Sequence, residues 1–419
     1  MANNNNKDKC NVPHLRFPEF SEEWEICKVS ELLDFYSTNS LSWEQLEYGT
    51  KAIMNLHYGL IHVGLPTMVD LTRDNLPNIK EDNMPKNFEL CKEGDVAFAD
   101  ASEDTNEVAK PIEFFDLAGK NIVCGLHTIH GRDNKNKTVI GFKGYAFSSS
   151  AFHNQIRRIA QGTKIYSIST KNFSECFIGI PSKVEQTKIA TLLRLIDERI
   201  ATQNKIIEKY ESLIKGLNDS LYAQYGDDVL TSFSSLGFSY SGLSGKSAQD
   251  FGSGKPFITY LNVYSNNIIN EKDFQYVAIK EGEKQNVVEY GDVLFTLSSE
   301  TPEEVGIGSV YLGNENVYLN SFCFGIHIIN TKIAFPPYLS YYVSSTPFRK
   351  FIYPYAQGST RFNLCKVDFE KASIKLPSLE NQKRIYSILS HIETKTETEK
   401  SLLDLYNSQK QYLLRQMFI

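Results

Sequence analysis

A long heptad seam constrains the fold of this chain more than any other feature. Between Gln186 and Leu221, apolar residues recur at alternating steps of four and three, with one polar interruption at Gln203. This spacing is typical of the a and d positions of a coiled coil. A helix of about 36 residues would be roughly 54 Å long, too long for the core of one domain. The segment therefore predicts a spacer or a coiled-coil arm, whose seam includes Ile189, Leu193, Ile196, Ile200, Ile207 and Tyr210.

The same kind of seam occurs again near the C-terminus. Adding 196 to Ile189 gives Ile385, and the same offset carries the helix entry at Pro181-Ser182 onto Pro377-Ser378. Two such helices can bury their seams on each other, which one exposed seam cannot do at low cost. The alternative is two unrelated amphipathic helices. The second seam has more polar interruptions and includes Ile385, Leu389, Ile392, Leu403 and Tyr406.

The segments that precede the two helices also resemble each other. Gly94-Asp95-Val96-Ala97-Phe98 has a counterpart in Gly291-Asp292-Val293-Leu294-Phe295, and Ala160-Gln161-Gly162-Thr163 has one in Ala356-Gln357-Gly358-Ser359. A near-constant offset over the whole length indicates one unit that has been duplicated. We therefore predict an α+β fold in which two mixed domains are separated by two long antiparallel coiled-coil helices, with an internal pseudo-two-fold repeat. The expected segments are a disordered tail (1–11), domain 1 (12–181), helix 1 (182–226), domain 2 (227–377) and helix 2 (378–419).

Charge is distributed unevenly within each repeat. The formal net charge of −6 does not by itself suggest nucleic acid. However, no acidic residue lies between Asp133 and Glu175 or between Glu315 and Asp368, and the two intervals overlap when the repeats are aligned. Chance clustering is the alternative, but the pattern favours a surface that faces a polyanion. The basic residues of the two intervals include Lys135, Lys137, Lys143, Arg157, Arg158, Lys164, Lys332, Arg349, Lys350 and Arg361.

Both intervals contain a short glycine loop whose chemistry suits DNA. Glycine lets the backbone approach closely, and its N–H can meet a phosphate, while Gln, Thr and Arg can reach phosphates or base edges. An ordinary β-turn is the alternative interpretation. The candidate DNA-contacting residues are Gln161, Gly162, Thr163 and Lys164 in the first loop, and Gln357, Gly358, Ser359, Thr360 and Arg361 in the second.

The sequence contains several partial matches to enzyme and metal-binding motifs, and each lacks an essential residue or arrangement. Gly245-Lys246-Ser247 lacks the earlier glycine of a nucleotide-binding loop, because Tyr240 occupies that position. Phe335 cannot accept the hydrogen bond that the Asn/Asp-Pro-Pro-Tyr loop of amino-methyltransferases makes, so a helix start is expected there. Cys124, His127 and His130 lie on an expected strand with His127 on the opposite face, so no metal site is predicted. Seven scattered cysteines and the lack of an apolar span favour a reduced, cytoplasmic protein.

The order of these motifs resembles the specificity (S) subunits of type I restriction–modification systems. The resemblance covers essentially the whole chain and includes the opening Val12-Pro13-His14-Leu15-Arg16-Phe17-Pro18 and Trp24, the repeated Gly-Asp-Val-x-Phe, the Gln-Gly loops and the Pro-Ser helix entries. It implies a non-catalytic subunit whose two domains each read half of a split DNA target. It also implies that the helices dock two methyltransferase (M) subunits and that two restriction (R) subunits join them.

The resemblance places the cofactors elsewhere. S-adenosylmethionine, ATP and Mg²⁺ are expected on the partner subunits, and none is expected on this chain. The seam residues listed above are the candidate partner-docking residues. A two-lobed coiled-coil adaptor that binds only proteins is the alternative function, and binding to duplex DNA separates the two.

Overall fold

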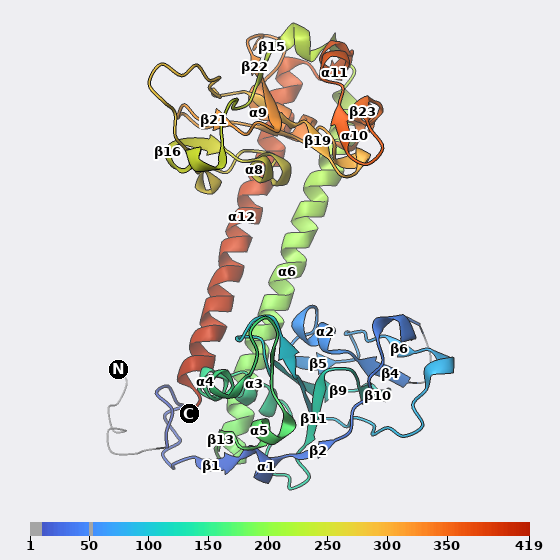
Figure 1. The fold of residues 1–419 in the computed structure, drawn as a ribbon, viewed down its shortest axis with the longest axis vertical. Coiled ribbons are helices and arrows are strands. Elements are labelled where there is room, and N and C mark those ends of the chain that lie inside the picture. Colours follow the sequence, from blue (N-terminus) through green and yellow to red (C-terminus); the bar gives the residue numbers. More distant parts are fainter. Residues whose placement is uncertain (1–10, 50–52) are drawn as a thin grey trace. The chain divides into compact units, whose positions relative to one another are not determined.

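The computed structural model describes residues 11–49 and 53–419 and divides into two compact units (Figure 1). Unit 1 extends to Asn204 and includes Ser401–Ile419, and unit 2 is Lys205–Lys400. Each unit is a mixed α/β globule that packs on parts of two long helices, so the predicted fold class is confirmed. The tail predicted for 1–11 lies outside the described residues except for Asn11. Within the described residues, no helix is both long and apolar enough to span a bilayer.

The globule of unit 1 contains two main sheets. One has the strand order β2-β11-β7-β9-β5 and the other has the order β10-β4-β6-β3. The strands are β1 (Glu25–Lys28), β2 (Asp34–Tyr36), β3 (Leu46–Glu47), β4 (Ile53–Leu56), β5 (Met68–Asp70), β6 (Asn78–Ile79), β7 (Val96–Ala99), β8 (Ala101–Ser102), β9 (Pro111–Asp116), β10 (Asn121–Cys124), β11 (Thr128–Arg132), β12 (Tyr166–Ser167) and β13 (Phe177–Ile180). The short helices are α1 (Val29–Leu32), α2 (Tyr58–His62), α3 (Lys143–Phe147), α4 (Ser150–Ile159) and α5 (Thr170–Ser174).

Unit 2 has the same ingredients in smaller sheets, ordered β15-β22-β18-β20, β17-β16-β21 and β19-β24-β23. The strands are β14 (Val229–Thr231), β15 (Gly237–Ser241), β16 (Phe251–Ile258), β17 (Gln275–Val277), β18 (Val293–Thr296), β19 (Ser298–Ser299), β20 (Gly308–Val310), β21 (Tyr318–Leu319), β22 (Cys323–Ile328), β23 (Ala356–Gln357), β24 (Phe362–Leu364) and β25 (Ile374–Leu376). The short helices are α7 (Phe233–Leu236), α8 (Tyr260–Ser265), α9 (Pro336–Tyr342), α10 (Thr346–Ile352) and α11 (Lys366–Lys371). Short 3-10 turns are η1 (Trp43–Gln45), η2 (Glu81–Asn83), η3 (Ala248–Asp250), η4 (Glu271–Asp273), η5 (Pro302–Glu304) and η6 (Tyr353–Tyr355).

The two long helices are α6 (Lys183–Tyr225, 43 residues) and α12 (Leu379–Gln416, 38 residues). In unit 1 they run antiparallel, because Asp197 pairs with Lys410 and Arg199 with Tyr406. The seams pack into the cores of the globules: Ile189 and Leu193 join the core of unit 1, and Ile385 and Leu389 join that of unit 2. Because this packing removes apolar area from water, it supplies most of the stability of these helices.

This packing corrects the prediction of partner docking for the six seam residues that are buried. A partner cannot reach side chains that already lie in the core of the same chain. Ile189, Leu193, Ile196, Ile207, Ile385 and Leu389 are buried, and Ile200, Tyr210, Ile392, Leu403 and Tyr406 are partly buried. A docking surface on these helices therefore cannot use the six buried side chains, and the docking role of the five partly buried residues stays a prediction.

One buried glutamine fixes each globule to the start of its long helix. Gln186 Oε1 accepts a hydrogen bond from Val139 N (2.8 Å), and its Nε2 donates to the carbonyls of Lys137 (3.1 Å) and Pro181 (2.9 Å). Gln382 makes the same three bonds in unit 2, to Phe335 N (2.8 Å), Ile333 O (2.7 Å) and Pro377 O (2.8 Å). Every partner atom belongs to the backbone, and every partner is displaced by the same 196 positions as the glutamine itself. The duplication seen in the sequence is therefore a duplication of contacts.

Candidate nucleic-acid interface

In both units the Gln-Gly loop is the exposed tip of a small hairpin. In unit 1, Gln161 and Ser167 exchange backbone hydrogen bonds of 2.9 and 2.8 Å, and residues 161–165 are exposed. In unit 2, Gln357 pairs with Asn363 between β23 and β24, and residues 357–361 are exposed. The pairing holds the base of each loop and leaves its tip projecting into solvent.

Glycine is required at each tip by the backbone. Gly162 has φ 143° and Gly358 has φ 146°, a region that residues with a Cβ rarely adopt. A Cβ at Gly162 would lie 1.9 Å from the carbonyl oxygen of Ile165, and one at Gly358 would lie 2.1 Å from that of Arg361. The chain can therefore close this tight loop only with glycine, which explains why it occupies the same position in both repeats.

Each hairpin pairs with a short strand. This short strand directly follows the strand that contains the Gly-Asp-Val-x-Phe motif. Strand β12 pairs with β8, with Tyr166 opposite Ser102, and β24 pairs with β19, with Phe362 opposite Ser299. Strand β8 follows β7, and β19 follows β18. The two repeated motifs of the sequence, far apart along the chain, are thus brought together at one edge of each globule.

Basic residues flank the hairpin tips. Arg157 and Arg158 are exposed in the last turn of α4, and Lys164 is exposed at the tip itself. Arg157 Nη1 donates to Asn106 Oδ1 (3.2 Å), in the loop after β8. In unit 2 the exposed basic residues of the equivalent edge are Lys350, at the end of α10, and Arg361, at the tip of the loop. These groups form a candidate phosphate-binding edge in each unit.

Other basic residues predicted to contact DNA lie elsewhere or are already paired. Lys143 is 3% exposed and forms an ion pair with Glu113 (3.1 Å), so its assignment as a DNA contact was wrong. Lys137 pairs with Glu25 (2.6 Å), which raises the pKa of the lysine, and Lys135 donates to the carbonyl of Glu31 (2.7 Å). These partners come from before the acid-free interval, so an interval that lacks acids in sequence does not lack them in space.

Lys332 and Arg349 also differ from the simple prediction. Lys332 is exposed but precedes Ile333, whose carbonyl is bound by Gln382, so it lies near the start of the long helix. Arg349 donates to the carbonyls of Glu303, Val305 and Gly306 at 2.6–2.8 Å. Its largely buried guanidinium, whose pKa burial lowers, therefore holds the loop after β19 and is not free for a phosphate.

One further element belongs to this edge and was not predicted from the sequence, the short helix α2 in unit 1 and α8 in unit 2. His62 Nε2 lies 2.9 Å from Ala101 O, and Tyr260 OH donates to Ser298 O (2.8 Å). Tyr264 OH donates to Glu304, lowering the pKa of that carboxyl. Tyr58 of α2 corresponds to Tyr260 of α8, so the number of positions between these two helices differs from the offset that relates the other repeated motifs. A search that allowed insertions for the pattern of Tyr followed four positions later by His or Tyr could have found them.

Comparisons with known proteins agree with this architecture. The family model described as the type I restriction modification DNA specificity domain matches residues 244–405. A solved structure described as a type I restriction–modification S subunit from M. genitalium is similar, with TM-score 0.52 and 16% identity over 97% of this chain and 99% of that one. Residues 244–405 thus match the model of this domain, and the chain shares its fold with that solved structure.

Two further matches cover different shares of the chain. A structure described as the basis of complex assembly and conformational transition of the type I R-M system has TM-score 0.58 and 16% identity, and the match covers 93% of this chain and 96% of that one. The type I restriction enzyme EcoKI specificity subunit of Escherichia coli (strain K12) is 23% identical over 303 residues. That match covers 66% of this chain and 64% of the relative, so the chain spans slightly less than two thirds of its length in the alignment.

Proposed function

We propose that this chain is the non-catalytic DNA-recognition subunit of a type I restriction–modification complex and that each unit reads one half of a split target. The observation that carries the proposal is the exposed Gln-Gly hairpin, which occurs on the same pair of strands in both units. One reading element in each of two globules suits a target with two separate halves. The DNA specificity domain matched in unit 2 supports the nature of the ligand.

The chemistry of the hairpin suits both the backbone and the bases of DNA. The exposed N–H groups around Gly162 and Gly358 can approach phosphates closely because the glycines have no side chain. The exposed side chains of Gln161 and Gln357 can bond bidentately to adenine, and that of Arg361 to guanine. A hairpin fixed at its base presents these groups with little further ordering, which reduces the entropic cost of binding.

The proposal extends to partner subunits and their cofactors. The complex would contain two methyltransferase and two restriction subunits, which would carry S-adenosylmethionine, ATP and Mg²⁺. Val184 and Leu195 are exposed on α6 and, at 100° per residue, lie within about 20° of each other around that helix. Such an exposed apolar pair on the outward face of a long helix is a candidate docking surface, in place of the buried seam.

Reversing the charge of Arg157 and Arg158 tests the DNA-binding edge. The double variant Arg157→Glu/Arg158→Glu is expected to weaken binding to many unrelated duplexes, because phosphate contacts carry no sequence information. Each lost contact should reduce the slope of log affinity against log salt by about 0.9. We would measure binding of the full chain, alone and with its methyltransferase subunit, to labelled duplexes over a series of salt concentrations.

The matched control is Lys383→Glu/Arg384→Glu, an exposed basic pair on α12 whose reversal changes the net charge equally. It should leave the salt slope near that of the unaltered chain. Equal effects of the two double variants would mean that binding depends on net charge and not on this edge. If the unaltered chain binds no duplex in either form, the protein-only adaptor becomes the better explanation.

A further inference from the structure

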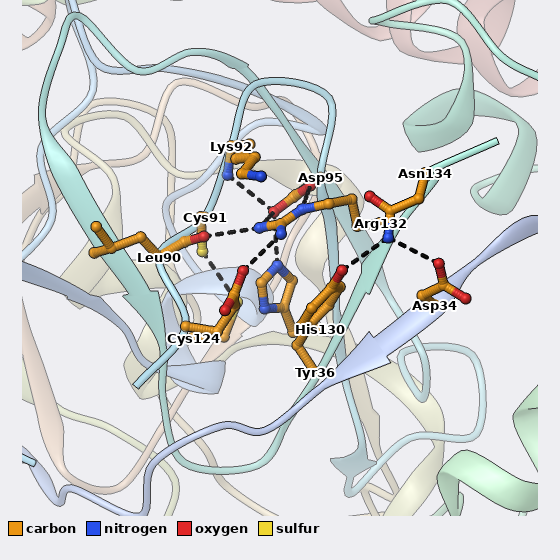
Figure 2. Close-up of polar contacts among 11 residues, drawn as sticks. Asp34, Tyr36, Leu90, Cys91, Lys92, Asp95, Cys124, His130, Arg132 and Asn134 are labelled. Carbon is orange, nitrogen blue, oxygen red and sulfur yellow. Dashed lines mark hydrogen bonds and ion pairs between the residues drawn. The ribbon is translucent and has the colours of Figure 1, made fainter. Parts of the chain in front are cut away.

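Two cysteines and a histidine meet in the core of unit 1, outside the candidate DNA-binding edge. Cys124 ends β10, His130 lies in the middle of β11, and Cys91 is held against β10 by a bond from its N–H to Ile122 O (2.8 Å). All three are buried, with exposed fractions of 5% or less. The two sulfurs are 3.6 Å apart, and both lie within 4.8 Å of a ring nitrogen of His130. Figure 2 shows the ring beside Cys124 and below Asp95.

The histidine is oriented by a carboxylate on its other side. Its Nε2 lies 2.8 Å from Asp95 Oδ2, and Asp95 also accepts bonds from Arg132 (2.8 Å) and from the N–H of Lys92 (2.9 Å). Because the Asp95 carboxylate only accepts hydrogen bonds, the His130 ring must carry its proton on Nε2 to donate to it. This leaves a lone pair on Nδ1, and Nδ1 is a buried atom without a hydrogen-bond partner among the described residues. A carboxylate behind a histidine is the usual support of a metal-binding imidazole.

The distance between the sulfurs fits shared coordination of one ion. Two thiolates at about 2.3 Å from a tetrahedral metal lie about 3.8 Å apart, close to the 3.6 Å found here. A disulfide would require about 2.05 Å. The three groups together also match the Cys₂His donor set that binds zinc with one coordination position left for another ligand.

We propose that Cys91 Sγ, Cys124 Sγ and His130 Nδ1 form a site for a thiophilic metal ion of the Zn²⁺ class. Binding would release one proton from each thiol, and the two thiolates would neutralise the two charges of the ion. His130 would bind as the neutral imidazole and keep its proton toward Asp95. The cluster would therefore carry no net charge into the core, and it would tie β10, β11 and the segment before β7 together.

Unit 2 provides an internal comparison, because it lacks all three ligands at the equivalent backbone positions. Val288 replaces Cys91, since its N–H bonds to Val317 O as that of Cys91 bonds to Ile122 O. Leu319 replaces Cys124, because the residue after each bonds to the neighbouring parallel strand in the same way. Gly325 replaces His130, being paired with Tyr240 as His130 is paired with Tyr36.

The carboxylate of unit 2 is satisfied differently. Tyr240 OH donates to Asp292 Oδ2 (2.6 Å), and its ring occupies the space that a Cβ at Gly325 would need. His327 Nδ1 also lies 2.8 Å from Asp292 Oδ1, so unit 2 closes the same region with apolar side chains, a tyrosine and a histidine in place of the two thiols. The thiols and the imidazole of unit 1 are not demanded by the shared fold, and this favours a specific role for them.

Metal content tests the site in the full-length chain. The reduced protein would be incubated with Zn²⁺, passed over a chelating resin and assayed by atomic emission. We expect one retained Zn²⁺ per chain, and loss of it in Cys91→Ser and in Cys124→Ser. The control is Cys176→Ser, which alters another buried cysteine of unit 1 and should retain the ion. Failure of the unaltered chain to retain Zn²⁺, or retention by both site variants, would overturn the proposal.

A second measurement on the unaltered protein guards against misfolding of the variants. Co²⁺ bound in place of Zn²⁺ should show thiolate-to-cobalt charge-transfer absorption, which requires sulfur ligands. Zn²⁺ should also raise the midpoint of thermal unfolding in the unaltered chain and in Cys176→Ser, because a ligand that binds only the folded state stabilises it. A cobalt complex without charge-transfer bands would place the ion elsewhere and contradict the assignment.

Discussion

Replacing Gln186 with leucine is expected to lower the free energy of unfolding of unit 1 by about 2–5 kcal/mol. The side chain is fully buried and makes three hydrogen bonds, all to backbone groups. Leucine would leave one N–H and two carbonyls without their partner, and each unsatisfied buried group costs about 1–3 kcal/mol. Part of this loss is offset by the apolar side chain and by relaxation of the partly exposed loop at Lys137 and Val139.

The chain offers a selective probe of this effect. Its only two tryptophans, Trp24 and Trp43, both belong to unit 1, so tryptophan fluorescence reports the unfolding of that unit. Trp24 is buried, and its Nε1 donates to Glu185 next to the altered residue (3.3 Å). Denaturant titration of the full chain, followed by fluorescence, should show a clearly lower midpoint for Gln186→Leu.

Thr187→Leu is the matched control, because it introduces the same side chain at the next, exposed position. It should change the free energy of unfolding by no more than about 0.5 kcal/mol, as surface substitutions usually do. Equal midpoints for the two variants would show that the glutamine bonds contribute little. Gln382→Leu should destabilise unit 2 to a similar extent, detected by circular dichroism.

The long helices and the duplication could be predicted from the sequence because both depend on local or periodic signals. A heptad seam follows from the geometry of the helix itself, and the offset of 196 requires only that the same residues recur. The buried glutamines show how far this reached. The repeated Pro-Ser entry marks the start of each long helix, but the sequence does not reveal that Gln186 and Gln382, a few positions later, each bind a segment nearly fifty positions earlier.

Neighbours in sequence within the acid-free intervals are not always neighbours in space. Lys143 and Arg157 belong to the same acid-free interval, yet the first is buried against Glu113 and the second is exposed at the hairpin edge. The loop glycines could be recognised from the sequence, because a backbone conformation that only glycine tolerates requires glycine at the same position in both repeats. Strand pairing decides which basic residues share a surface with those loops, and no local sequence pattern encodes strand pairing.

The cysteine and histidine cluster was missed for a related reason. Cys124, His127 and His130 were interpreted as one strand, but the structure divides this segment into β10 and β11 with a turn between them. His127 then pairs with Asp100 (3.0 Å), and the second thiol comes from Cys91. Because the chain changes strand between Cys124 and His130, the neighbour of Cys124 is not His127 but Cys91, which lies 33 positions before Cys124 in the chain.

Exchange of one globule should change one half of the recognised DNA sequence and leave the other half unaltered. This expectation rests on the proposed function, and the structure explains why the exchange is feasible. Strands β14 and β25 pair antiparallel, with Val229 opposite Leu376, so the globule of unit 2 leaves and rejoins the helices at adjacent points. An insert between these strands, replacing about residues 232–373, would begin and end on an intact host ladder.

The helices hold the globule largely through its backbone. Asn218 donates to Tyr341 O (2.7 Å), Asp219 accepts from Thr346 N (2.9 Å), and Gln382 bonds to backbone groups of residues 333 and 335. A donor globule from a type I specificity subunit can therefore present the same atoms with different side chains. Apolar packing against Tyr222 and Leu217 must still be matched, so a donor with large apolar residues at the positions of Tyr338 and Tyr342 is preferred.

We would sequence the DNA of cells that carry the hybrid by a method that detects modified bases. The methylated motif then shows which half-sites the hybrid reads. We expect the half-site read by unit 1 to be unchanged and the other to become that of the donor. The matched control replaces 232–373 with the same segment of a subunit that shares the recipient's second half-site, and it should reproduce the original motif. A hybrid that methylates DNA with both halves altered would contradict independent reading by the two units. An active hybrid with the original motif would move recognition outside the exchanged globule, because the only residues altered would then have no influence on the bases that are read.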